Sequence, residues 1–169
     1  MMKMPIKMLV TSVLMLPGLT SLANASEQNS LEQVAHFQHL AFENKAKTYT
    51  DYARLFNLCQ QKPNAMQCGK EYRDAEQMYL SAKARSDVLD LLIKGDNFRA
   101  PLPESAQVDL TKALIEVGYL DGVNVPSEKQ LLAAVNKWNK QNNIERTDRL
   151  LLIQLMMIQI DAESRTGGV

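Results

Sequence analysis

Two cysteines and two histidines are the residues of this chain whose types and spacing suggest chemistry of their own. Cys59 and Cys68 are its only cysteines, and they stand nine positions apart. That spacing does not fit a Cys-x-x-Cys redox centre, and an even number of cysteines in an exported chain favours a disulfide over a metal site. We therefore predict a Cys59–Cys68 disulfide, with two free thiols as the alternative.

His36 and His39 lie one helical turn apart and form the one arrangement that suggests a metal site. Glu32 and Glu43 lie a turn to either side, so a third ligand is available. Charged residues at this spacing are common on solvated helix faces, and we expect no metal or other cofactor. Because the chain has no nucleophile in a recognisable setting and no glycine-rich phosphate loop, we predict that it is not an enzyme. The alternative is a glycosidase, whose paired carboxylates meet in space rather than in sequence.

The first 25 residues have the order of a secretory signal peptide. Two lysines give a positive start, an apolar stretch runs from Met8 to Leu22, and Ala23-Asn24-Ala25 ends it with small residues two apart. The apolar stretch is short for a bilayer span, and Pro17-Gly18 interrupts it, which argues against an anchored helix. We predict cleavage after Ala25, a periplasmic location, and no integral membrane segment in the mature protein.

Composition restricts the classes of partner. The chain has 19 basic and 19 acidic residues, and loss of Lys3 and Lys7 with the signal, which holds no acidic residue, leaves 17 and 19. A chain this close to neutrality lacks the basic footprint of a nucleic-acid-binding protein, and we expect no nucleic-acid partner. Glycine and proline are scarce, which favours helices throughout.

Residues 26–98 predict an antiparallel helical hairpin whose tip the disulfide closes. Apolar residues fall mostly three, four or seven apart from Leu31 to Gln60, which indicates one long helix or two helices broken near Thr50-Asp51. Pro63-Asn64 predicts a turn. The second helix, from about Gly69 to Lys94, carries a heptad seam. Its members are Tyr72, Ala75, Tyr79, Ala82, Ser86, Leu89 and Ile93.

Three shorter helices are expected after a stiff linker at residues 99–103. Their expected ranges are 104–117, 128–141, and from 147 or 148 to 162, with a loose tail at 163–169. Gly118 is placed to end the first helix, and Ser127 with Gln130 forms a capping box at the start of the second. The predicted fold class is therefore all-α, a disulfide-closed hairpin followed by a three-helix module over residues 104–162.

Four short motifs between Leu110 and Leu155 carry a family resemblance. They are Leu110-Thr-Lys-Ala-Leu114, Val117-Gly-Tyr-Leu-Asp-Gly122, Leu131-Leu-Ala-Ala-Val-Asn-Lys-Trp-Asn139 and Asn143-Ile144. Together they resemble the peptidoglycan-binding-like domain, a small three-helix module attached to many cell-wall hydrolases. The resemblance implies a non-catalytic envelope protein that binds peptidoglycan or anchors a partner at the cell wall.

The candidate binding residues implied by this resemblance are Tyr119, Asp121, Lys137, Trp138 and Asn139. Tyr119 and Trp138 would give an apolar wall for a glycan or a stem peptide, or else would pack between the helices as core aromatics. Lys137 would meet carboxylates of a stem peptide, or else would be a solvated lysine. Asp121 is also explained by turn chemistry.

Three features favour a different class of function. The loop before Ser127 is shorter than the family's, the second helix of the hairpin carries a heptad seam, and nine of the eleven residues from Leu150 to Ile160 are apolar. Such a helix must be covered on more than one side, either by the rest of this chain or by another protein. The alternative function is a structural or accessory subunit of an envelope-spanning secretion or pilus assembly, which would use the same fold for protein docking.

Overall fold

A computed structural model describes residues 20–95, 97–122 and 124–166 of the chain. This part of the chain is all-helical and holds no β-strand, so the predicted fold class is confirmed at that level. The elements are α1 (Thr20–Gln61), η1 (Met66–Cys68), α2 (Lys70–Lys94), η2 (Glu104–Ala106), α3 (Gln107–Glu116), α4 (Glu128–Gln141) and α5 (Leu152–Thr166), with η marking a 3-10 turn. None of the described helices combines the length and apolar character needed to cross a bilayer.

The predicted signal peptide lies mostly outside the described residues, which begin at Thr20. The predicted cleavage site after Ala25 falls in the first turns of α1, where the backbone is helical.

Helix α1 is one continuous helix of 42 residues. Of the two predicted alternatives, one long helix or two helices broken near Thr50-Asp51, the single helix is therefore confirmed. Thr48 and Thr50 stay within the helix, and their hydroxyls bond back to the preceding turn. Thr48 Oγ1 donates to the Asn44 carbonyl at 2.8 Å, and Thr50 Oγ1 donates to the Ala46 carbonyl at 2.9 Å.

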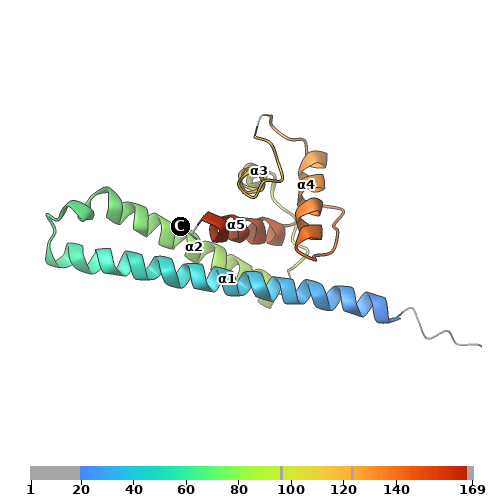
Figure 1. Cartoon of the computed structure of the whole chain (residues 1–169), viewed down its shortest axis with the longest axis horizontal. Coiled ribbons are helices and arrows are strands. Elements are labelled where there is room, and N and C mark those ends of the chain that lie inside the picture. Colours follow the sequence, from blue (N-terminus) through green and yellow to red (C-terminus); the bar gives the residue numbers. More distant parts are fainter. Residues whose placement is uncertain (1–19, 96, 123, 167–169) are drawn as a thin grey trace, which may run out of the picture.

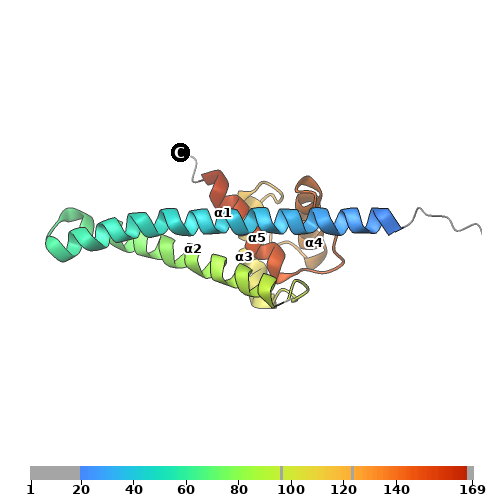
Figure 2. The ribbon, with the colours of Figure 1, turned by 90° about the horizontal axis from the view of Figure 1, so that it is seen from below.

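Helices α1 and α2 lie side by side and run in opposite directions (Figures 1 and 2). The predicted Cys59–Cys68 disulfide closes their shared tip by joining α1 to η1, just before α2, with the two Cα atoms 5.5 Å apart. Every member of the heptad seam on α2 is buried or half-buried. The seam therefore faces α1 and the core, as its spacing requires.

Helix α5 lies between the α1–α2 pair and α3, and contacts all three (Figure 1). Its apolar run is buried nearly throughout, with Ile158 at 0 % exposure and Met157 at 2 %. The rest of this chain therefore covers the run from Leu150 to Ile160. The same buried cluster takes in Phe37 of α1, Leu89 of α2 and Trp138 of α4.

The last helix begins at Leu152 rather than at Thr147 or Asp148, because the residues before it are bonded in an extended conformation. The Leu102 amide donates to the Leu150 carbonyl, and the Leu152 amide donates to the Ala100 carbonyl, each at 3.0 Å. The segment predicted as a linker thus pairs with the residues preceding α5. The domain boundary placed at 99–103 stays a prediction.

The same helix continues to Thr166, so the loose tail predicted from residue 163 is wrong for 163–166. Arg165 explains the extension. Its guanidinium donates to both carboxylate oxygens of Asp161 at 2.8 Å and to the Val117 carbonyl at 3.2 Å. The bonds to Asp161 hold Arg165 within α5, and the bond to Val117 ties this last turn to the end of α3. Residues 167–169 lie outside the described part.

Candidate functional site

Trp138 is a core residue. Its side chain is 0 % exposed, and its ring packs against Phe37 of α1 with ring centroids 5.3 Å apart. The indole Nε1 donates to Asp161 Oδ2 of α5 at 2.7 Å. Of the two roles predicted for Trp138, ligand wall or core aromatic, the structure therefore shows the core aromatic, because a ring with no exposed surface cannot contact a ligand.

Asn139 is also fully buried and organises the turn after α4. Its Nδ2 donates to the Glu145 carbonyl at 3.0 Å, and its own carbonyl accepts from the Ile144 amide at 2.8 Å. Asn143 between them adopts a left-handed backbone with φ of 55°, a conformation that asparagine tolerates well. The Asn139 side chain thus fixes the turn that leads from the end of α4 back along that helix, and it does not face a ligand.

Tyr119 and Asp121 lie in the turn after α3, at the surface. Gly118 starts this turn with φ of 82°, and the Tyr119 amide donates to the Leu114 carbonyl at 2.8 Å. Tyr119 is half-buried and Asp121 is exposed. The Asp161 carboxylate, and more weakly the Tyr119 hydroxyl, raise the pKa of Arg165.

Asp121 borders a cleft of about 300 Å³ between α3, the following loop and the start of α4, which we call the Asp121 cleft. Its lining is Thr111, Ile115, Leu120, Asp121, Gly122, Asn124, Pro126 and Gln130. The walls combine one carboxylate with neutral amides and apolar side chains. Gln130, at one edge of the cleft, belongs to the predicted capping box. In that box the Ser127 amide donates to Gln130 Oε1 at 2.8 Å.

Lys137 does not share this cleft but lines a second one, of about 740 Å³, on the outward face of α4. We call it the basic cleft. Its lining is Lys129, Leu132, Ala133, Asn136, Lys137, Lys140, Ile144 and Arg146. The structure therefore separates the five predicted binding residues. Asp121 and Lys137 border different clefts, Tyr119 is half-buried, and Trp138 and Asn139 lie in the core.

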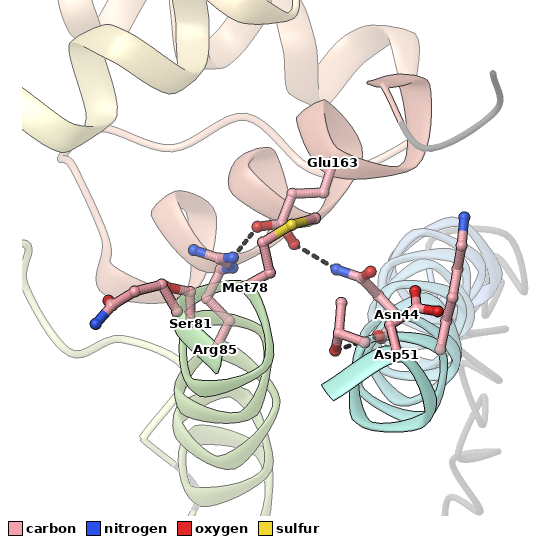
Figure 3. Close-up of a pocket in the computed structure, with 9 residues that line it drawn as sticks. Asn44, Asp51, Met78, Ser81, Arg85 and Glu163 are labelled. Carbon is pink, nitrogen blue, oxygen red and sulfur yellow. Dashed lines mark hydrogen bonds and ion pairs between the residues drawn. The ribbon is translucent and has the colours of Figure 1, made fainter. Parts of the chain in front are cut away.

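A third cleft, of about 420 Å³, lies where α1, α2 and the end of α5 meet (Figure 3). Figure 3 shows Asn44 of α1 and Arg85 of α2 pointing toward Glu163 of α5. Glu163 pairs with the Arg85 guanidinium and accepts a hydrogen bond from Asn44 Nδ2 at 2.7 Å.

This third cleft was not visible in the sequence because its residues are far apart along the chain. Burial lowers the pKa of Arg85, and the nearby Glu116 carboxylate opposes that effect. Since both Glu163 oxygens are bonded, this carboxylate anchors α5 to the α1–α2 pair and is poorly placed to act as a general acid.

The histidine pair does not gather a ligand set. His39 Nε2 lies 3.2 Å from Glu43 Oε1, while the His36 ring packs edge-on against Phe37 at 5.5 Å. Across the described residues, no group of three histidine, cysteine or acidic side chains is placed to hold a metal ion.

Comparison with known proteins found no matching family model, no matching curated protein and no matching solved structure.

Proposed function

We propose that this chain is an exported, non-catalytic envelope protein that binds peptidoglycan or anchors a partner at the cell wall. The proposal includes the arrangement expected from the sequence, a helical hairpin joined to a peptidoglycan-binding-like module. Its support is the signal-peptide pattern of residues 1–25 and the four motifs between Leu110 and Leu155. The observation that carries it is the Asp121 cleft.

The chemistry of the Asp121 cleft suits a neutral, hydroxyl-rich ligand. Asp121 is exposed and makes no ion pair with a described residue, so its oxygens are open to accept hydrogen bonds from sugar hydroxyls or amides. Asn124 supplies both a donor and an acceptor. Ile115 and Leu120 supply the apolar surface on which a sugar face or an acetamide methyl can rest. An amino-sugar strand with N-acetyl groups has these features.

Retention of the mature chain on purified, insoluble peptidoglycan tests the proposal. We expect the parent protein to be retained, and the double variant Asp121→Asn/Asn124→Ala to be retained about tenfold less, as expected when a few hydrogen bonds are lost. Asp148→Asn/Asn64→Ala makes the same changes at exposed positions outside the cleft and should leave retention unchanged. Retention of the parent no better than that of an unrelated exported helical protein would refute wall binding.

A second candidate function, an accessory subunit of an envelope-spanning secretion or pilus assembly, is favoured by a row of exposed rings on α1. Phe42, Tyr49 and Phe56 are spaced seven residues apart and are 61, 53 and 40 % exposed. Seven residues of helix rise about 10.5 Å, so the rings form one line along the helix. Exposed aromatic rings in a row are typical of protein interfaces.

Photo-crosslinking in cells tests this second candidate. A crosslinking residue at Tyr49 should capture a defined envelope protein, whereas one at Val125, which is 98 % exposed in the loop before α4, should not. A clean monomer by native mass spectrometry, together with no captured partner at Tyr49, would contradict docking through this row.

A further inference from the structure

The basic cleft on α4 concentrates positive charge in a chain that is nearly neutral overall. Lys129, Lys137, Lys140 and Arg146 all line it and are all exposed, and its lining holds no carboxylate. None of the four makes an ion pair with a described acidic residue. By contrast, some lysines of α2 are paired along their own helix, as Lys70 is with Asp74 and Lys94 with Asp90.

The fold holds these cations together. Lys129, Lys137 and Lys140 share one face of α4 because they stand eight and three residues apart in a helix. Arg146 comes from the following loop, which is bonded back onto α4. The Thr147 amide donates to Asn136 Oδ1 at 2.9 Å, and the buried Asn139 side chain holds the Glu145 carbonyl at 3.0 Å. The loop therefore returns Arg146 to the same face.

Apolar side chains form the floor between the cations. Leu132 and Ile144 are half-buried, with their inner sides packed against the core. Ala133 also lines the cleft, and its small side chain leaves room above the helix. A ligand seated here would thus meet positive charge at the rim and apolar surface beneath.

The spread of the cations indicates a ligand with several charges in a row. Lys129 and Lys140 are separated by about 16 Å along the helix axis, so a single phosphate or carboxylate would reach only part of the set. An extended peptide advances about 3.3 Å per residue and turns alternate side chains to opposite sides. About five residues would cover the cleft, with acidic side chains toward the rim and apolar ones toward the floor.

We propose that the basic cleft is a docking site for an extended acidic segment of a partner protein, in which acidic and apolar residues alternate. Charge complementarity carries the proposal, because four cations without carboxylate partners are gathered over an apolar floor. The site is separate from the Asp121 cleft and does not depend on wall binding. It gives the protein a second surface, one that takes a polypeptide.

A fluorescein-labelled peptide of four glutamates alternating with four leucines, followed by fluorescence anisotropy with the full mature chain, tests this proposal. Binding should weaken as salt rises, and the peptide with glutamine in place of glutamate should bind at least about tenfold more weakly. Lys137→Glu/Arg146→Glu should weaken binding of the acidic peptide by about tenfold or more, since two attractions become repulsions.

The matched control is Lys62→Glu/Arg73→Glu, which makes the same change in net charge at exposed positions of the hairpin. It should change the affinity by less than about twofold, and circular dichroism should show both variants folded. Lys129→Gln/Lys140→Gln, which removes charge without reversing it, should fall between the parent and the reversed variant.

Four results would overturn the proposal. The first three are equal binding of the acidic peptide by the parent and the reversed cleft variant, an equal loss of binding in the control variant, and equal binding of the glutamine peptide by the parent. The fourth is displacement of the labelled acidic peptide by a soluble peptidoglycan stem peptide or an RNA oligonucleotide at a lower concentration than the unlabelled acidic peptide needs.

Discussion

The two ends of the α1–α2 pair differ in what covers them. At one end, α5 and Trp138 of α4 pack on the pair and bury Phe37 and Leu89 to 2 % and 0 % exposure. We call this the covered end. The other end, around residues 49–79, extends beyond α5 as two helices alone (Figure 1). We call it the distal arm. There, Tyr49 is 53 % exposed and Phe56 is 40 % exposed.

The contrast shows how each end is held together. The covered end has a multilayered apolar core, which supplies most of the stability of a small domain. The distal arm has one layer of ring contacts, such as Tyr52–Tyr79 with centroids 5.5 Å apart, and the Cys59–Cys68 disulfide. Stability should therefore be concentrated at the covered end, while the distal arm should depend on its cross-link and open first.

Removal of the Trp138 side chain should have the largest effect, because it takes away the contact between α4, α1 and α5 at the covered end. Trp138→Ala should lower the free energy of unfolding by about 3–5 kcal/mol, since it leaves a large cavity and an Asp161 oxygen without its indole donor. Urea unfolding measures the change. Lys140→Ala, on the exposed face of the same helix, should change it by less than about 0.5 kcal/mol. Similar values for both variants would refute the assignment of Trp138 to the core.

Loss of the disulfide should act mainly on the distal arm. Cys59→Ser/Cys68→Ser should lower the free energy of unfolding by roughly 2–3 kcal/mol, because the unfolded chain regains the freedom of a closed loop. Hydrogen exchange should accelerate in residues 49–79 far more than around Leu89. Equal acceleration at both ends would mean that they unfold as one unit and would remove the distinction between them.

A smaller effect is expected at the turn that ends α3. Gly118 has φ of 82° and nothing within 4 Å of the position its Cβ would take, so Gly118→Ala should cost only the backbone strain, about 1 kcal/mol. Gly122→Ala is the matched control in the same turn. Its Cβ would contact the flexible end of Ile115 at 3.4 Å, without a positive φ, and the unfolding free energy should change less. A reversed order would show that crowding, not backbone conformation, limits this turn.

Local patterns predicted the helices, the tip and the caps. The spacing of apolar residues placed α2 to within one residue, the cysteine count placed the disulfide, and Ser127 with Gln130 marked the start of α4. Each of these signals lies within a few residues of the feature that it specifies, which is why sequence alone was sufficient.

Features that depend on distant partners were missed. The start of α5 moved to Leu152 because residues 100 and 102 bond the segment before it, and no local signal records that pairing. The motif around Trp138-Asn139 has the same residue types whether its aromatic ring faces a ligand or the core. Arg146 joined Lys137 only because the buried Asn139 side chain folds the loop back. Sequence alone could therefore nominate single candidate residues, but it could not show which of them the fold brings together.

In the distal arm, the contact between Tyr72 and Tyr52 changes the pKa of Tyr72. A hydrogen bond to the Tyr52 hydroxyl, and to a smaller extent desolvation, raise the pKa of Tyr72 to about 12. Because the folded pKa lies above that of a free tyrosine, about 10, the contribution of Tyr72 to stability is complete below pH 10 and is lost as pH rises toward 12. Tyrosinate absorbance should therefore show a late-titrating component that belongs to Tyr72. Tyr52→Phe should return the pKa of Tyr72 to about 10. If the late group persists in Tyr52→Phe, the ring contacts of the distal arm are not held by this hydrogen bond, and the disulfide alone would distinguish the arm from an unsupported pair of helices.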